Sequence, residues 1–206
     1  MRKPLGTVLL GLGGFLLTTA LLLWFWVPGQ VKQTPLNVNS TTRLAGTGSY
    51  LGEAGGPLKA TSRTVVDGPK SKDGVVVFDT FTCLLRDPSG NAPDCVSSDG
   101  ANSALINAGT DTFATDRHTA LSVNAKKYVG ADALQHDGLV NKFPFDTEKK
   151  TYPFWDSLLG RAVDAKFDGT ATLDGLLTDK FHIVVDNEPA EISQGVSGTY
   201  SDDKTM

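Results

Sequence analysis

The sequence predicts a mainly β protein, with an N-terminal transmembrane helix followed by a single antiparallel β-rich extracytoplasmic domain. Three observations predict this class: an uncharged apolar run near the N-terminus, later runs of β-branched and aromatic residues, and Asp-Gly pairs typical of hairpins. We expect a signal-anchor helix over residues 1–28, a juxtamembrane linker over 29–35, a β-rich ectodomain over 36–193 and a polar flexible tail over 194–206.

The N-terminal segment is apolar and uncharged over residues 5–27. A helix of this length reaches about 35 Å, which exceeds the roughly 30 Å of hydrocarbon in a bilayer. Aromatic residues stand at its far end, at Trp24, Phe25 and Trp26, where rings favour the membrane interface. We expect Pro28 and Gly29 to end the helix.

The flanks of the apolar run indicate an uncleaved anchor and its orientation. A cleaved signal peptide has a shorter apolar core and small residues at its cleavage site, whereas bulky aromatic residues stand here. Arg2 and Lys3 place the N-terminus in the cytoplasm, because basic flanks are retained there. We therefore expect the protein to cross the cell membrane once, with its ectodomain outside.

The ectodomain sequence predicts a series of short strands. Turn residues separate β-branched and aromatic runs, and the pairs Asp168-Gly169 and Asp174-Gly175 predict two hairpins. Turn formers dominate 86–112, which predicts a long surface excursion, and only 126–135 favours a short helix. The expected strands are 41–50, 61–66, 74–85, 112–122, 138–145, 150–155, 161–167, 171–173 and 179–185.

Composition and motifs exclude several function classes. The chain has 206 residues and a net charge of −4, so it lacks the basic excess that a nucleic-acid partner requires. It contains no P-loop, HExxH or G-x-S-x-G motif, and His118, His136 and His182 lack the spacing of a helical metal site. We expect no cofactor, no metal and no catalytic residue; a zinc cluster of these histidines with Asp116 or Asp137 is the alternative.

Cys83 and Cys95 are the only cysteines in the sequence. Their spacing fits neither a paired metal knuckle nor a CxxC redox motif. In an oxidising compartment these cysteines would form a disulfide. Across so short a loop it would add on the order of 3 kcal/mol to the free energy of unfolding on the chain-entropy model. We predict that disulfide, with two free thiols as the alternative.

Residues 136–156, HDGLVNKFPFDTEKKTYPFWD, are the most distinctive stretch of the chain. Its aromatic residues either line a groove for acyl chains or sugar rings, or form ordinary core. Asp146 and Glu148 could act as a carboxylate pair on a glycan, but two acids this close on a polar turn are typical of solvated residues. The candidate groove residues are Phe143, Phe145, Tyr152, Phe154 and Trp155.

This stretch closely resembles the signature of an actinobacterial membrane-protein family called porin PorA, long filed as a domain of unknown function. The resemblance continues in the DRHT run at 116–119 and in residues 161–176. It implies an anchored envelope protein, with some members linked to lipoglycan assembly. Relatives usually continue to a second transmembrane helix near the C-terminus, so we expect a shortened product or a fragment. The matching motif residues are His136, Gly138, Leu139, Lys142, Pro144, Asp146, Thr147, Glu148 and Lys149.

Three functions follow from these observations. The leading expectation is a non-enzymatic envelope factor that binds a lipid, a lipoglycan or an envelope protein beside the membrane. The alternative is an extracytoplasmic glycan- or lipid-modifying enzyme that uses Asp137, Asp146 or Glu148. The family label adds a porin-like oligomer, although the interrupted strand pattern differs from the long alternating strands of a pore.

The orientation can be tested with reporter fusions after residue 40. A reporter active only in the cytoplasm should be silent there and an exported reporter should be active, because the basic N-terminus stays inside. Activities in intact cells measure this, and the reverse pattern would contradict the predicted orientation.

Overall fold

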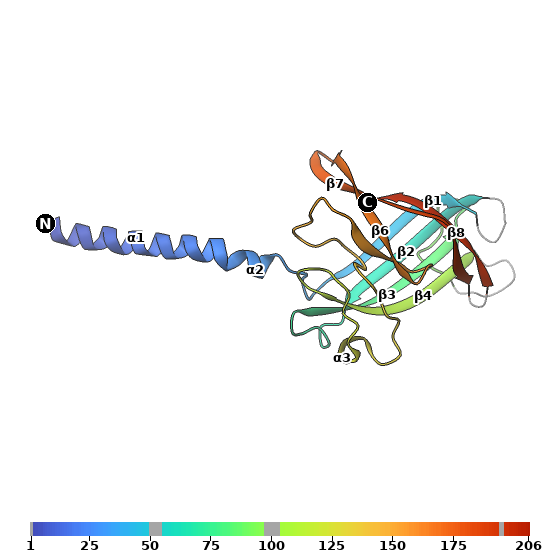
Figure 1. Ribbon diagram of the computed structural model, residues 1–206, viewed down its shortest axis with the longest axis horizontal. Coiled ribbons are helices and arrows are strands. Elements are labelled where there is room, and N and C mark those ends of the chain that lie inside the picture. Colours follow the sequence, from blue (N-terminus) through green and yellow to red (C-terminus); the bar gives the residue numbers. More distant parts are fainter. Residues whose placement is uncertain (1, 50–54, 97–103, 194–195) are drawn as a thin grey trace. The chain divides into compact units, whose positions relative to one another are not determined.

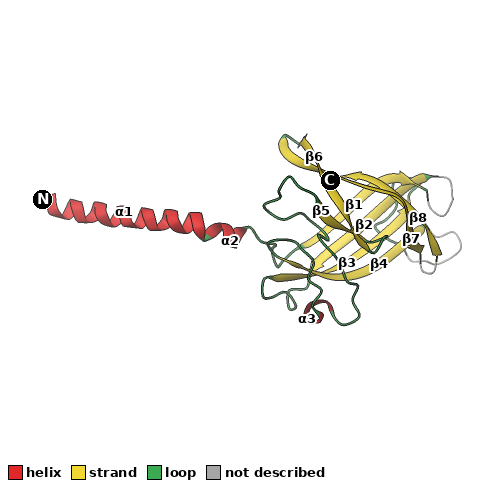
Figure 2. Cartoon of the chain, in the orientation of Figure 1, coloured by secondary structure: helices red, strands yellow, loops and turns green. Residues whose placement is uncertain are grey.

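The computed structural model describes residues 2–49, 55–96, 104–193 and 196–206. The chain divides into two compact units, Met1–Thr34 and Pro35–Met206. The first unit is helical and the second is a β domain, as Figures 1 and 2 show. The predicted class, mainly β and antiparallel with one N-terminal apolar helix, is confirmed.

The helical unit contains α1 (Arg2–Phe25) and α2 (Val27–Val31). The stretch Gly6–Phe25 is long and apolar enough to cross a membrane, and none of it is buried inside the protein. α1 ends at Phe25, because Pro28 has no N–H to donate to the carbonyl of Trp24 one turn earlier. The chain then makes one further helical turn with Pro28 at its start, where proline is favoured. Pro28 and Gly29 therefore interrupt the helix, and the prediction that the helix stops there holds only for α1.

The β domain consists of two antiparallel sheets, each a four-stranded meander in chain order (Figure 1). Isolated bridges link the two sheets through the segment that connects them, at Thr115–Ser122, Leu121–Leu139 and Leu139–Phe154. The first sheet contains β1 (Asn39–Gly48), β2 (Gly56–Val66), β3 (Val75–Arg86) and β4 (Leu105–Asp116). The second contains β5 (Tyr152–Asp156), β6 (Arg161–Leu173), β7 (Leu176–Ser193) and β8 (Val196–Thr205).

The strand β3 is buried on both faces over its apolar N-terminal half. Val76 and Phe78 pack on one face with Phe113 of β4. Val77 lies on the opposite face, in a cluster with Tyr128 of the short helix α3 (Lys126–Val129). The first sheet therefore has protein against both of its faces at this end.

Cys83 of β3 and Cys95 form a disulfide with their Cα atoms 5.8 Å apart, which confirms the predicted pairing. Asp94 beside Cys95 accepts hydrogen bonds from Arg43 of β1 at 2.7 and 2.5 Å, and lies 3.3 Å from the Lys59 ammonium of β2. The hydrogen bond from Arg43 lowers the pKa of Asp94 to about 2. A covalent bond and two ion pairs thus hold the loop after β3 against the first sheet.

The two Asp-Gly pairs have different structures. Asp174 and Gly175 have φ of 49° and 82° and form the tight turn between β6 and β7, so this hairpin is confirmed. Gly169 has φ of 89° and lies at a register shift inside β6, so the hairpin predicted at this pair is wrong. Its positive φ serves a β-bulge, and the two predicted strands around it form one long strand.

The segment between the sheets contains less regular structure than predicted. Residues 138–145 form no strand beyond the bridge at Leu139, because Gly138 has φ of 69° and Pro144 lacks an N–H for a ladder. The predicted helix at 126–135 is confined to α3, since Gly130 leaves the helical region with φ of 96°.

Two strands extend into regions predicted to be irregular. β4 begins at Leu105, so the surface excursion after β3 is shorter than the predicted 86–112. Val196–Thr205 pairs with β7 as β8, where we predicted a polar flexible tail. The polar sequence there lacks the alternation of apolar and polar residues that predicts a strand. The segment is a strand because it pairs with β7.

Gly138 should be the glycine most sensitive to substitution. A Cβ there would lie 2.4 Å from the carbonyl oxygen of Pro153, in addition to the strain of positive φ. Gly160 has a similar φ of 62° but open space around its Cβ position, so it is the matched control. We expect Gly160→Ala to cost about 1–2 kcal/mol and Gly138→Ala more than about 4 kcal/mol in the free energy of unfolding. Chemical denaturation followed by circular dichroism measures both, and equal losses would contradict the close approach to Pro153.

Candidate functional site

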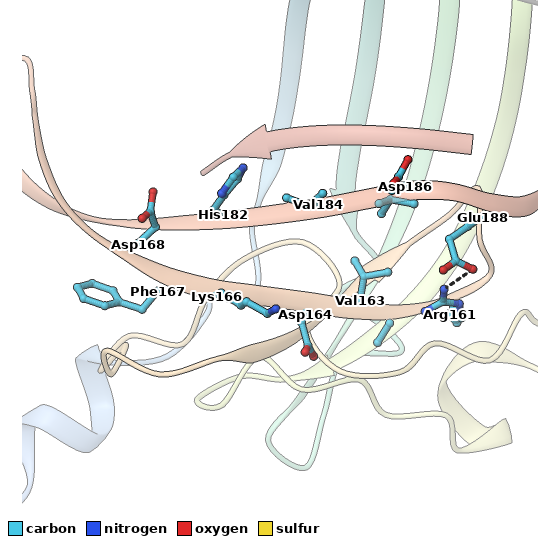
Figure 3. Close-up of a pocket in the computed structure, with 12 residues that line it drawn as sticks. Arg161, Val163, Asp164, Lys166, Phe167, Asp168, His182, Val184, Asp186 and Glu188 are labelled. Carbon is cyan, nitrogen blue, oxygen red and sulfur yellow. Dashed lines mark ion pairs between the residues drawn. The ribbon is translucent and has the colours of Figure 1, made fainter. Parts of the chain in front are cut away.

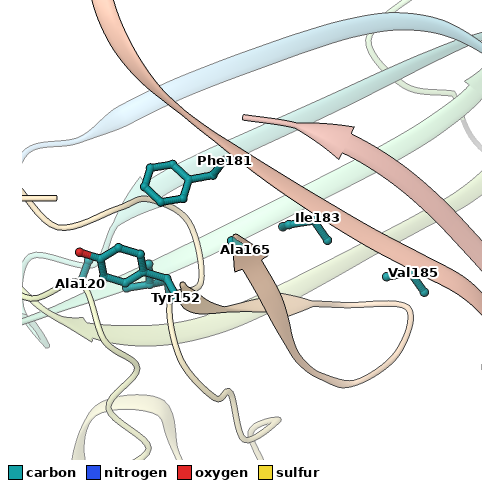
Figure 4. Packing of buried hydrophobic residues seen from close by; sticks show 7 residues of the cluster. Ala120, Tyr152, Ala165, Phe181, Ile183 and Val185 are labelled. Carbon is teal, nitrogen blue, oxygen red and sulfur yellow. The ribbon is translucent and has the colours of Figure 1, made fainter. Parts of the chain in front are cut away.

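Residues 136–151 form a strap over one face of the second sheet. Leu139 is fully buried, and its N–H donates to the Pro153 carbonyl at 2.8 Å while its own carbonyl accepts from the Trp155 N–H at 2.7 Å. Further along, Phe143 stacks on Phe181 of β7 with ring centroids 4.3 Å apart and meets the Tyr152 ring edge-on at 5.6 Å. The strap therefore covers the apolar cluster of β5 to β7, part of which is drawn in Figure 4.

The turn within the strap is held by short-range hydrogen bonds. The Thr147 hydroxyl donates to the Pro144 carbonyl at 2.6 Å, and the Glu148 N–H donates to the Tyr152 hydroxyl at 2.8 Å. Glu148 also pairs with Lys150. Asp146 and Glu148 are both exposed on this turn. The two predicted carboxylates thus lie at the surface, where water solvates them.

A groove of about 510 Å³ lies beside the strap, where the strap meets β5 and β7. Its apolar wall includes Phe143, Phe145 and Phe154, which are three of the five predicted groove residues. Phe145 is 47% exposed, although it is a large aromatic residue. Lys142 also lines the groove, with its ammonium 4.0 Å from the centroid of the Phe145 ring. The predicted site thus corresponds in part to a real concavity.

The other two predicted groove residues lie in the interior. Tyr152 and Trp155 are each 8% exposed. Tyr152 belongs to the cluster under the strap. Trp155 stands three residues after Tyr152 on β5, and because side chains alternate along a strand it points to the opposite face. Tyr152 and Trp155 therefore pack the fold and do not line the groove.

The residue against which Trp155 packs is His136, whose side chain is 1% exposed. The two rings lie 4.7 Å apart, and on its other side His136 contacts Phe113 of β4 at 5.7 Å. The His136 Nε2 atom lies 2.8 Å from a carboxylate oxygen of Asp111. Its backbone N–H donates to Asn124 Oδ1 at 3.1 Å, and its carbonyl accepts from the Asn124 amide at 2.7 Å. His136 therefore joins the two sheets.

A second cavity, of about 640 Å³, lies on the β6–β7 hairpin, where the sequence motifs predicted no site (Figure 3). Its lining mixes acids and bases, including Asp164, Lys166 and the pair Arg161–Glu188 at 3.1 Å. Alternating charges along β6 could have signalled this cavity. No group of three metal-ligating side chains occurs there or elsewhere in the described ranges. Its lining holds four carboxylates and two cations, mixed along both strands, and we assign it no chemistry.

Truncation of two aromatic residues of the motif should destabilise the protein to different extents. Trp155→Ala removes a buried ring between the sheets and should cost about 3–5 kcal/mol in the free energy of unfolding. Phe145→Ala removes a half-exposed ring from the groove wall and should cost less than about 1 kcal/mol. Denaturation of the full chain followed by circular dichroism compares them, and a similar loss in both would show that Phe145 is core.

The comparisons with known proteins agree with the resemblance in the strap. A family model described as Porin PorA matches residues 5–205. Porin PorA of Corynebacterium amycolatum is 25% identical over 142 residues, which cover 63% of this chain and 34% of that relative. The chain thus spans about a third of the length of the curated relative it matches. With its apolar helix, it is a membrane-integral protein of the cell envelope, and it belongs to the porin PorA family.

Proposed function

We propose that this chain is a non-enzymatic envelope factor, anchored by its N-terminal helix, whose β domain lies outside the cytoplasm and binds the acyl part of a lipid or lipoglycan. The observation that carries the proposal is the groove beside the strap, with the half-exposed Phe145 in its wall. Its volume of about 510 Å³ is that of a small-molecule binding site.

Ordinary core packing does not account for Phe145. Phe143 and Phe154 already contact each other at 5.6 Å over the cluster of the second sheet. Phe145 stands outside that cluster and keeps 47% of its surface in water, which leaves part of its hydrophobic free energy unrealised. An acyl chain in the groove would cover this surface together with the neighbouring rings.

The exposed carboxylates favour binding over catalysis. A carboxyl group acting as a general acid near neutral pH needs a raised pKa, which burial in an apolar site supplies. Asp137, Asp146 and Glu148 are all exposed, and Glu148 is paired with Lys150. This arrangement supports a non-enzymatic role for the motif.

A porin-like oligomer is the second candidate, because the family and the matched relative carry that description. Strands of 10 residues or more, such as β1, β7 and β8, are long enough to cross a bilayer when tilted. A pore also needs an outward apolar band that faces lipid. Here the strap covers one face of the second sheet and α3 covers one face of the first, which argues against a barrel made from this chain alone.

Photo-crosslinking in nanodiscs tests the acyl-binding proposal on the full chain. A fatty-acyl probe with a diazirine in its chain should label peptides of the strap and of β5 as well as α1. We expect Phe145→Ala to lower labelling of the strap at least about fivefold, because the ring forms the groove wall. Labelling at α1 serves as the internal reference.

Leu173→Ala is the matched control, since Leu173 is 66% exposed on the β6–β7 hairpin and does not line the groove. It should leave labelling of the strap unchanged. Labelling confined to α1 in the unmodified protein would contradict the proposal. Stepwise conductance of the same sample in a planar bilayer would favour the porin-like oligomer instead.

A further inference from the structure

Lys142 is a cation in the groove wall without a carboxylate beside it. Its ammonium lies over the Phe145 ring, and within the described part of the chain no acid lies within ion-pair distance of it. The neighbouring cations differ: Lys149 lies 3.8 Å from Asp179, and Lys150 is paired with Glu148. Lys142 is therefore the unneutralised cation of this groove.

Burial makes this arrangement unfavourable for the charged form of Lys142. Lys142 is half-buried, and burial lowers its pKa with no carboxylate to oppose the shift. Contact with the face of the Phe145 ring offsets part of the lost hydration. An anion in the groove would supply the missing charge and accept hydrogen bonds from the ammonium.

The one acid that lines the groove does not neutralise Lys142. Asp179 lines the groove, and one of its carboxylate oxygens lies 3.8 Å from the ammonium of Lys149. Phe154, Phe181 and Thr147 in the other walls carry no charge. The groove thus combines one apolar wall with one available positive charge.

We propose that the ligand of this groove is an anionic amphiphile, with its acyl chain along the phenylalanine wall and its carboxylate or phosphate headgroup on Lys142. The proposal rests on the acyl-binding function given above and names the class of ligand. Charge complementarity selects a headgroup with a net negative charge over a zwitterionic or neutral one.

The experiment compares probes that share one diazirine-bearing acyl chain and differ only in the headgroup. The full chain in phosphatidylcholine nanodiscs is titrated with the fatty acid, the lysophosphatidic acid, the lysophosphatidylcholine and the monoacylglycerol. Labelling of the strap, mapped by mass spectrometry, gives a half-saturating concentration for each probe. We expect both anionic probes to saturate at about tenfold lower concentration than the other two, because a charge-assisted hydrogen bond is strong at a partly dry site.

Three variants assign this preference to one side chain. Lys142→Gln should remove the anionic preference and leave labelling by the neutral probe in place, whereas Lys142→Arg should retain the preference. Lys150→Gln is the matched control, because Lys150 is paired with Glu148 and does not line the groove. It should behave as the unmodified protein.

The outcomes separate the headgroup from the groove itself. Equal saturation by all four probes, or an anionic preference that survives Lys142→Gln, would overturn the headgroup assignment while acyl binding stands. Absence of strap labelling with every probe would overturn both proposals. Displacement of the anionic probes by inorganic phosphate at similar concentrations would show a phosphate site and contradict an amphiphile. Labelling that falls as protein concentration rises, with crosslinked dimers, would show that a second copy occupies the groove.

Discussion

His136 lies where the two sheets of the β domain meet, and the arrangement of the domain depends on its burial. Each sheet is a separate meander, so ladder hydrogen bonds alone fix only the strands within it. Isolated bridges of the connecting segment cross between them, and so does a row of tilted rings from Phe113 through His136 to Trp155. A buried imidazole is costly unless its polar atoms have partners, and a carboxylate oxygen of Asp111 lies 2.8 Å from Nε2. Asn124 hydrogen-bonds the backbone N–H and carbonyl of the same residue. The polar contacts also fix the orientation of the ring, which apolar packing alone would leave less specific.

The same histidine fixes one end of the strap, and this determines where the groove forms. Two residues after it, Gly138 lets the backbone approach Pro153, and Leu139 then hydrogen-bonds to β5. At the other end the strap leads directly into β5. The intervening residues must therefore arch over the sheet, and only Phe143 reaches the cluster beneath. Phe145, two residues further and beyond Pro144, stays at the surface and becomes a groove wall. A loop held at both ends by a rigid scaffold is a common way to present binding residues.

Local signals in the sequence predict local features of this protein well and long-range features poorly. The anchor helix, the apolar strand β3 and the Asp174-Gly175 turn follow from patterns within a few residues. The same dipeptide at Asp168-Gly169 forms a bulge, because pairing with β7 on a register set elsewhere overrides the local preference. For the site, the motif located the strap, and strand alternation could have separated Trp155 from Phe154. The role of His136 could not be foreseen, since the partners of its ring stand on β4 and β5 and nothing near it in sequence specifies them.

An open groove suits a protein attached to the bilayer. The groove is lined mainly by side chains from the strap and from β5 and β7, so a ligand can enter without separating the two sheets. On the proposed function, the apolar helix would keep the protein where lipids are concentrated, and a modest affinity would then be sufficient for occupancy. Tight enclosure would slow exchange of the ligand, whereas a partly exposed ring such as Phe145 gives up some binding free energy and permits faster release. If the proposed function is right, such a balance would fit a protein that exchanges amphiphiles better than one that stores them.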